Sequence, residues 1–379
     1  MAFMKVIIAP DKFKGSLTAI EVCNAVEKGI KKADPSIEVI KHPIADGGEG
    51  TLDILDHYFK LKTIDVKVHN PLFKIISSNY KVSKDTAYIE MSKSSGLQLL
   101  SKKEQNCFYT SSFGTGELIL DAIEKGFKNI VLFIGGSATN DAGIGMACAL
   151  GYSFYNKQGI KIKPIGKELI NINKIDSRNL KFDLNKINFT VISDVKNPLY
   201  GNNGAAFMYA SQKGASKKEI EILNSGLINF DNQIKIHFGK YVAYIKGSGA
   251  AGGLGAGSVS FLNAKMVSGI DFVLEKTNFK KYFKDKIDLI ITGEGSVDKQ
   301  TLEGKVVKGI SDLAKLYKVP VYIVAGVIKD KESILKNINP LIISEVMEVN
   351  ITTKEAMKNA AIYIEDLVYS TFKTLKKVI

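Results

Sequence analysis

The sequence has no tryptophan and a single arginine, Arg178, among its 379 residues. Arginine makes the commonest base-specific contacts with DNA. Its near absence argues against nucleic-acid recognition, although the formal net charge is +13. The lysines that carry this charge are spread along the chain and form no long basic block. The positive charge therefore favours small anionic substrates.

Cysteine is also scarce, and Cys23, Cys107 and Cys148 are odd in number and far apart. This spacing argues against a disulfide or metal framework and is typical of reduced thiols in a cytoplasmic protein. No apolar run approaches the ~18 residues of a membrane-spanning helix, and residues 1–10 lack the layout of a signal peptide. The histidines form no spaced metal cluster in the sequence. We therefore expect no membrane partner.

Glycine-rich loops follow several predicted strands, and one of these loops is central to the sequence. Residues 130–134 are apolar and mostly β-branched, which predicts a buried strand, and residues 143–151 predict a helix. The loop between them offers backbone and side-chain donors at Gly135, Gly136, Ser137, Thr139 and Asn140. Backbone N–H groups at such a helix start can bind a phosphate. An ordinary tight turn is the alternative interpretation.

A second polar loop, residues 11–16, follows a strand predicted over residues 5–10. A helix then begins at Thr18, which with Glu21 forms a predicted capping box. Open α/β sheets bind ligands at the carboxyl ends of their strands. Asp11, Lys12, Lys14 and Ser16 stand at such an end, and the candidate ligand-binding residues are Lys12, Lys14 and Ser16. Solvated loop charges are the alternative.

Acidic residues stand among glycines in two further loops. Asp46 and Glu49 follow the strand predicted over residues 37–44, and residues 293–298 follow the strand predicted over residues 287–292. Carboxylates in this setting suit a divalent cation or the abstraction of a hydroxyl proton. A glycine-rich turn with an acid at the helix start is the alternative. The candidates of the later loop are Gly293, Glu294, Gly295 and Asp298, followed by Lys305.

A fifth loop begins at Asp194, near the end of a strand predicted over residues 189–195. Asn197, Gln212 and Lys213 lie close to it in the sequence. Further strands are predicted over residues 63–68, 78–82 and 87–91, and helices over residues 52–59, 118–125, 217–237 and 355–375. This alternation of strands and helices predicts an α/β fold.

Residues 247–252 read Gly-Ser-Gly-Ala-Ala-Gly, and Asp271 follows about twenty residues later. The pattern resembles a dinucleotide fingerprint, which requires a strand before it. Only a short candidate strand, residues 241–245, precedes these glycines, so a glycine-rich hinge is the favoured interpretation. An NAD-dependent dehydrogenase remains an alternative.

Taken together, five strand-end loops combine glycine with acids, lysines and hydroxyls. Such loops can hold a polyphosphate and a divalent cation and can still supply an acid or a base, which is what phosphoryl transfer requires. Neither a P-loop nor the protein-kinase motif set is present. The residues thus predict an α/β enzyme for a small anionic substrate and favour a kinase; a non-catalytic sensor is the alternative from another class.

The loops, taken jointly, also resemble the bacterial type I glycerate kinases. The motifs that carry the resemblance are APDKFKGSLTA (9–19), PIADGGEGT (43–51), IGGSATND (134–141), NPLYGNNGA (197–205), QKGA (212–215), GAAGGLGAG (249–257) and ITGEGSVDKQTLEGK (291–305). The resemblance implies ATP- and Mg²⁺-dependent phosphorylation of D-glycerate. It also implies two α/β domains, one restriction-enzyme-like and one flavodoxin-like, with a cleft between them. Residues 1–65 plus 285–379 would form one domain and residues 66–284 the inserted other.

The resemblance also implies roles for the candidates. Asp194 or Asp46 would be the catalytic base, with Asp194 favoured, and Lys14 would join the catalytic group. Lys12, Lys14 and Ser16 would hold the glycerate carboxylate or the transferring phosphate, with Asn197, Gln212 and Lys213 as further substrate ligands. Gly135, Gly136, Ser137, Thr139, Asn140, Gly293 and Gly295 would bind ATP, and Glu49, Glu294 and Asp298 would bind Mg²⁺. The product is expected to be 2-phosphoglycerate, with 3-phosphoglycerate open, and a homodimer is one option.

Overall fold

The computed structural model describes residues 4–48, 50–299, 301–348 and 352–375, which divide into two compact units. Unit 1 combines the chain up to residue 58 with the chain from residue 268, and unit 2 comprises residues 59–267. The boundaries expected from the sequence lie at 65 and 285. Strand β3 (Lys62–His69) groups with unit 2 because it pairs along its whole length with β4 (Ile75–Ser83).

Unit 1 is built on a five-stranded parallel sheet. The spatial order of its strands is β13 (Ile342–Glu345), β12 (Val321–Ile328), β11 (Leu289–Val297), β1 (Lys5–Ile8) and β2 (Glu38–Lys41). Although β1 and β11 lie far apart in the sequence, they are neighbours, with Ile7 opposite Ile290. The loops that follow these two strands therefore meet at one edge of the sheet.

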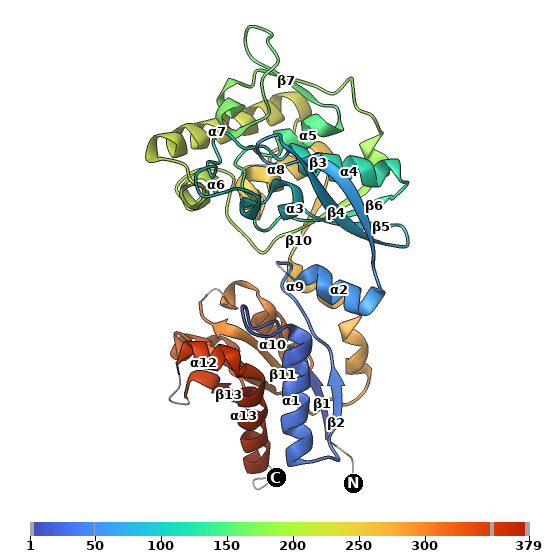
Figure 1. Cartoon of the computed structure of the whole chain (residues 1–379), viewed down its shortest axis with the longest axis vertical. Helices are drawn as coiled ribbons and strands as arrows, with labels where there is room; N and C mark the ends of the chain where they lie inside the picture. The colour runs from blue at the N-terminus through green and yellow to red at the C-terminus, as the bar shows by residue number, and fades with distance from the viewer. Residues whose placement is uncertain (1–3, 49, 300, 349–351, 376–379) are drawn as a thin grey trace. The chain divides into compact units, whose positions relative to one another are not determined.

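The rest of unit 1 consists mainly of helices (Figure 1). They are α1 (Ala19–Ala33), α2 (Thr51–Phe59), α9 (Gly269–Lys276), α10 (Val306–Leu316), α11 (Lys331–Ile338), α12 (Thr353–Lys358) and α13 (Ala360–Leu375), with 3₁₀ turns η5 (Phe279–Lys284), η6 (Thr301–Glu303) and η7 (Val346–Glu348). Helices α1 and α13 lie side by side, and a Cβ at Gly29 would lie 2.5 Å from the carbonyl oxygen of Glu365. The capping box at Thr18 and Glu21 is confirmed.

Two elements of unit 1 differ from the sequence prediction. Strand β11 does not end at Thr292 but continues to Val297, because Gly293 and Glu294 pair with β12. A Cβ at Gly293 would lie 1.9 Å from the carbonyl oxygen of Val324, so glycine permits the close approach of the two strands. The last predicted helix is divided at Asn359 into α12 and α13.

Unit 2 contains a six-stranded mixed sheet and a small two-stranded sheet. The order in the large sheet is β10 (Lys265–Val267), β9 (Asn188–Ile192), β6 (Asn129–Phe133), β5 (Thr86–Glu90), β4 and β3; the small sheet pairs β7 (Ser153–Tyr155) with β8 (Lys174–Asp176). Strands β10, β9, β6 and β5 run parallel, whereas β4 and β3 form an antiparallel edge. With both units combining parallel strands and helices, the α/β prediction is confirmed.

The remaining elements of unit 2 are mostly helical. They are α3 (Ser92–Ser95), α4 (Phe113–Glu124), α5 (Ile144–Leu150), α6 (Ala205–Tyr209), α7 (Lys217–Phe238) and α8 (Ala250–Leu262), with 3₁₀ turns η1 (Leu97–Leu99), η2 (Gly166–Asn171), η3 (Leu184–Lys186) and η4 (Ser211–Lys213). The strand proposed for residues 241–245 is wrong, because this segment forms turns. None of the helices in the described ranges is long and apolar enough to cross a membrane.

Candidate active site

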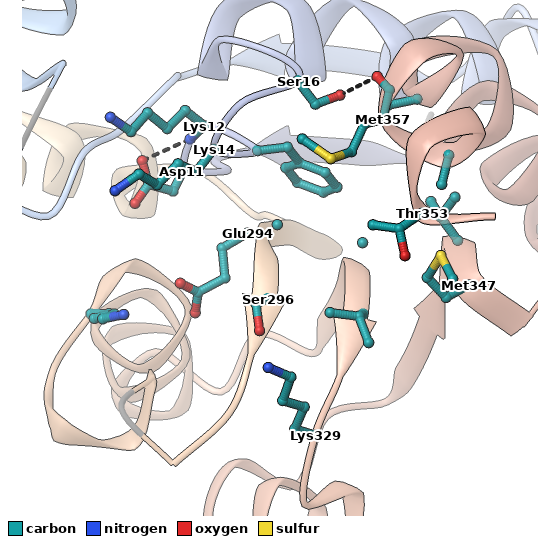
Figure 2. Close-up of a pocket in the computed structure, with 18 of the residues that line it drawn as sticks. Asp11, Lys12, Lys14, Ser16, Glu294, Ser296, Lys329, Met347, Thr353 and Met357 are labelled. Carbon is teal, nitrogen blue, oxygen red and sulfur yellow. Dashed lines mark hydrogen bonds between the residues drawn. The ribbon is translucent and has the colours of Figure 1, made fainter.

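A cavity of about 660 Å³ opens in unit 1 where β1, β11 and β12 end. This is the edge at which open α/β sheets bind ligands. One part of the wall is charged and contains Asp11, Lys12, Lys14, Asp46, Glu294, Lys305 and Lys329. Figure 2 shows Asp11, Lys12, Lys14 and Glu294 on one side of this cavity, with Met347, Thr353 and Met357 on the other.

Three acids, Asp11, Asp46 and Glu294, form the acid cluster of this cavity. The backbone N–H of Lys12 donates to Asp11 Oδ1 at 2.7 Å, and that of Gly48 donates to Asp46 Oδ1 at 2.9 Å. The Thr301 hydroxyl donates to Glu294 Oε1 at 2.6 Å. Local donors therefore fix the direction in which each carboxylate points.

Burial and the charges of neighbouring acids raise the pKa values of Asp11 and Glu294. Burial raises the pKa of Asp11 well above its ordinary value, and the nearby charges of Asp46 and Glu294 raise it further. Burial likewise raises the pKa of Glu294 to about 7, against the opposing effects of the Thr301 hydrogen bond and the Lys305 charge. Acids crowded in this way favour a proton or a cation near them.

Lysines give the charged wall its second property, which is affinity for anions. Lys12 and Lys14 follow β1, Lys305 precedes α10 and lowers the pKa of Glu294, and Lys329 follows β12. Asp11 and Lys305 were noticed in the sequence within polar loops but received no role, and Lys329 was not selected. The chain separates these three widely, and only the β1–β11–β12 pairing reveals that they share a cavity.

The remaining candidates of unit 1 are placed as follows. Ser16 and Gly295 line the cavity, whereas Gly293 packs against β12 and does not line it. Asp298 receives a 3.4 Å hydrogen bond from Ser296 and adds to the raised pKa of Glu294. Glu49 lies outside the described residues.

The described residues contain no group of three or more His, Cys, Asp or Glu side chains placed to hold a metal ion. Magnesium, however, is usually bound by one or two carboxylates together with substrate phosphates and water. The hard oxygen donors of the acid cluster fit that cation, and the raised pKa values of Asp11 and Glu294 show that a positive charge beside them is favourable.

Unit 2 contains a separate group of polar residues around Lys213. Lys213 is 5% exposed, and its ammonium donates to the Ser137 hydroxyl at 2.7 Å and to the Thr139 carbonyl at 2.8 Å. Burial lowers the pKa of this lysine to about 8. Within the part of the chain that the structure describes, the Thr139 hydroxyl and the Asn140 amide are buried without a hydrogen-bond partner. The loop after β6 and Lys213 thus lie together, although the sequence assigned the loop to ATP and Lys213 to the substrate.

Asp141, next in the same loop, is buried but well provided with donors. It accepts hydrogen bonds from the Ser112 N–H and hydroxyl, both at 2.7 Å, and from the N–H groups of Gly143 and Gly145 at 3.2 Å. Burial raises its pKa, and these donors oppose the rise. This aspartate joins the start of α5 to the segment before α4.

The other unit 2 candidates have different surroundings. Asp194 follows β9 and is half-buried, and Gln212 is exposed. The Asn197 amide donates to the Asn203 carbonyl at 2.8 Å, and its oxygen accepts from the Tyr209 hydroxyl at 2.7 Å. Gly135 and Gly136 are exposed, and a Cβ at Gly135 would meet nothing within 4 Å.

The glycine run at residues 247–252 has a packing role. Gly252 has φ +67°, and a Cβ there would lie 2.1 Å from the Thr139 carbonyl oxygen. Its own carbonyl accepts from the Ala142 N–H at 3.0 Å. With turns rather than a strand before it, the run lacks the context of a dinucleotide fingerprint.

Sequence comparisons relate this chain to glycerate kinases. The sequence model of the glycerate kinase family matches residues 6–376. The glycerate kinase of Bacillus cereus is 41% identical over 364 residues, covering 96% of this chain and 95% of that one. The glycerate kinase of Halalkalibacterium halodurans is 43% identical over 323 residues, or 85% of each chain. The glycerate 2-kinase of Escherichia coli is 41% identical over 329 residues, or 86% of each chain.

A crystal structure agrees with the sequence relatives. It is that of a Salmonella typhimurium LT2 protein with the provisional name glycerate kinase 2, and it superposes with a TM-score of 0.86 at 36% identity. The match covers 100% of this chain and 99% of that one. The resemblance found in the loops is therefore confirmed, and the chain belongs to the glycerate kinase family.

Proposed function

We propose that this enzyme phosphorylates the 2-hydroxyl of D-glycerate with ATP and Mg²⁺. Family membership supports the kinase activity, and the name of the Escherichia coli relative, glycerate 2-kinase, supports the position. The observation that carries the proposal is the unit 1 cavity, where lysines stand beside a buried acid cluster. Phosphoryl transfer requires mainly positioning and charge neutralisation, and these residue types supply both. A cytoplasmic location, suited to the free cysteines, is part of the proposal.

Two groups of residues suit the two anionic substrates. In unit 1, Lys12, Lys14 and Ser16 would hold a carboxylate or the transferring phosphate. In unit 2, the loop of residues 135–140 with Lys213 would hold the other anion. Lysine ammonium groups and backbone N–H groups are the usual donors to such ligands.

The acids would divide the remaining roles. Glu294 and Asp298 would hold Mg²⁺ together with phosphate oxygens, and Asp46 lies in the same cavity as Glu294. When bound, the metal supplies neutralisation of phosphate charge. Asp194, at the end of β9, would accept the proton of the attacking hydroxyl, with Asp46 as the other candidate base.

A phosphorus NMR time course with ATP, Mg²⁺ and D-glycerate tests the function. A 2-phosphoglycerate signal is expected, while a 3-phosphoglycerate signal would overturn the choice of hydroxyl alone. Binding of both ligands without any turnover would replace the kinase by a non-catalytic sensor. D-lactate, which lacks the 3-hydroxyl, serves as a control for substrate selection.

A further inference from the structure

The unit 1 cavity has an apolar wall that the phosphoryl chemistry does not use. Its residues come from the loop after β1, from η7 and from α12 with the start of α13. They are Phe13, Val346, Met347, Ala356, Met357 and Ala360. Figure 2 shows Met347 and Met357 near Thr353, on the side away from Asp11 and Glu294. We call these six residues the apolar wall.

Glycerate does not match the apolar wall. Each of its three carbons carries oxygen, so it offers no apolar face. The cavity volume of about 660 Å³ lies within the range of ~300–1,000 Å³ that holds drug-sized ligands. A ligand that suits both parts of the cavity needs an anionic end for the lysines and a flat apolar end for the methionines.

We propose that the apolar wall binds the purine base of ATP, so that the nucleotide is bound by unit 1. This inference rests on the proposed kinase function and assigns one of its substrates. The triphosphate then extends toward Lys12, Lys14 and Lys305. The anion-binding group around Lys213 in unit 2 is left for glycerate, which reverses the assignment made from the sequence.

The side chains of the apolar wall suit a flat aromatic ligand. Methionine is flexible and polarisable, and its sulfur makes favourable contacts with aromatic rings. Met357 is 41% exposed although it lines a cavity, so a base that covers it would bury apolar surface. Thr353 carries a hydroxyl on the same side, which can bond to a ring nitrogen of the base.

Local contacts hold the apolar wall against the loop of residues 11–16, which carries Lys12 and Lys14. The Ser16 hydroxyl donates to the Met357 carbonyl at 2.6 Å. Gly15 has φ +76°, and a Cβ there would lie 2.9 Å from Met357 Cε, so glycine leaves room for that side chain. The wall and the loop of residues 11–16 are thus parts of one preformed site.

The first test compares ATP with tripolyphosphate, which has the phosphates but no base. We replace Met347→Ala and Met357→Ala together and measure both dissociation constants by calorimetry with Mg²⁺ present. Loss of about 1.4 kcal/mol of base contact corresponds to a tenfold weaker ATP complex, so about tenfold is expected. Tripolyphosphate binding should change less than twofold. Met208→Ala, at an exposed methionine of unit 2, is the control.

Equal weakening of both ligands would overturn the inference, as would a rise in the glycerate KM alone. A second measurement does not depend on these variants. Wild-type protein is photolabelled with 8-azido-ATP, and the labelled peptides are identified by mass spectrometry. Labels on peptides that contain Phe13, Met347 or Met357 are expected, and labels confined to unit 2 would overturn the inference. Phosphoglycerate formation, measured in parallel, decides the kinase function separately from the position of the base.

Discussion

Two glutamates, one in each unit, show how differently the two regions use the same side chain. Glu294 in unit 1 is buried beside other acids, and its pKa is raised to about 7. Glu104 in unit 2 lies at the surface, and a hydrogen bond from Lys74 lowers its pKa to about 2. The first site favours the uncharged acid or a cation, whereas the second favours the free carboxylate.

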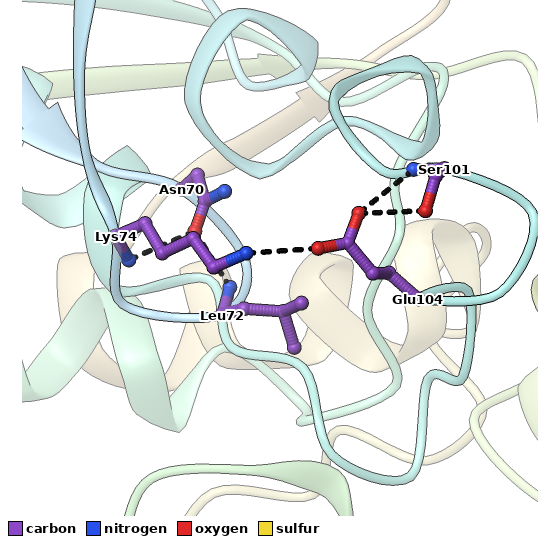
Figure 3. Close-up of polar contacts among 5 residues, drawn as sticks. All are labelled: Asn70, Leu72, Lys74, Ser101 and Glu104. Atoms are coloured by element: carbon purple, nitrogen blue, oxygen red, sulfur yellow. Dashed lines mark hydrogen bonds and ion pairs between the residues drawn. The ribbon is translucent and has the colours of Figure 1, made fainter.

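The surroundings of Glu104 explain its preference (Figure 3). Lys74 donates to Glu104 Oε1 at 2.8 Å, and the N–H and hydroxyl of Ser101 donate to Oε2 at 3.0 and 2.8 Å. The Asn70 side-chain oxygen accepts hydrogen bonds from the N–H groups of Leu72 and Lys74, and so stabilises the turn that carries Lys74. The Lys74–Glu104 pair joins the turn of residues 70–74 to the loop of residues 101–104, whereas the other bonds lie within one turn each, so Glu104 supports local structure.

The difference between the two glutamates indicates which carboxylates are candidates for ligand binding. A carboxylate that local donors and a lysine already satisfy gains little from a ligand. A carboxylate that burial and like charges make costly to ionise gains much from a bound cation. The acid cluster of unit 1 therefore carries the ligand chemistry that the Glu104 network lacks, and the following predictions probe that contrast.

The largest effect is expected at the proposed catalytic base, Asp194. A large loss of activity there would show that unit 2 also takes part in the reaction. We expect Asp194→Asn to lower kcat by about 10²–10⁴, the usual contribution of a positioned general base. Glu294→Gln, at a proposed metal ligand, should instead raise the Mg²⁺ concentration needed for activity. Steady-state kinetics at saturating and limiting Mg²⁺ separate the two effects.

Asp65→Asn provides the control for this pair, because Asp65 is an exposed residue of strand β3 and should leave kcat unchanged. If Asp194→Asn keeps more than a tenth of the wild-type kcat, Asp194 is not the base. The reaction would then depend on the acids of unit 1, and the two units would differ more in their roles.

The second prediction concerns the pH dependence that Glu294 imposes. The folded protein retains a proton on Glu294 up to pH ~7, whereas the unfolded chain releases it near pH 4.5. Stability therefore falls as the pH rises from about 4.5 to 7, by on the order of 3 kcal/mol. We expect Glu294→Gln to remove this fall, so that the variant gains stability relative to wild type across that range.

Thermal midpoints measured from pH 4.5 to 8 without nucleotide check this expectation. Glu275→Gln, at an exposed position of α9, is the control and should follow the wild-type pH dependence. Parallel curves for wild type and Glu294→Gln would mean that Glu294 is not held as an uncharged acid.

Much of this fold could be predicted from local sequence, and the reasons for the failures are specific. The strand at β6, the helix α5 and the Thr18 capping box follow from short-range patterns. The end of β11 was misplaced because a glycine-rich segment looks like a loop until β12 pairs with it.

The acid cluster was predicted only in part for a similar reason. Asp46 and Glu294 were selected from their glycine neighbours, but nothing near Asp11 in sequence indicates that it is buried beside them. Its burial depends on β1 pairing with β11, which the chain supplies almost three hundred residues later. Long-range pairing, which local patterns do not encode, creates the shared cavity.

The third prediction compares the acid cluster with Asp141, a buried acid whose carboxylate accepts several hydrogen bonds from neighbouring groups. The Ser112 hydroxyl donates to Asp141 and accepts from the Met146 N–H at 3.0 Å. Ser112→Ala removes both bonds and leaves a buried N–H unsatisfied, so we expect a loss of about 2 kcal/mol in the free energy of unfolding. Urea unfolding measures it.

Ser225→Ala is the matched control, because Ser225 is exposed on α7 and bonds only within its helix. Its effect should stay within about 0.5 kcal/mol. Equal stability of the Ser112 variant and wild type would show that Asp141 is not a structural acid, and the distinction drawn between buried acids would fail.

The smallest effect is expected at Glu104, where the sign is opposite to that at Glu294. Because the pKa of Glu104 is lowered, the stability it contributes is present above pH ~4.5 and is lost as the pH falls toward 2. Glu104→Gln should thus lower the thermal midpoint slightly at pH 7, and the difference from wild type should shrink at low pH and at 1 M salt, which screens surface pairs. Differential scanning calorimetry at pH 7 and pH 3 checks both trends. A deficit that grows on acidification would place Glu104 in the same class as Glu294 and remove the contrast between the two regions.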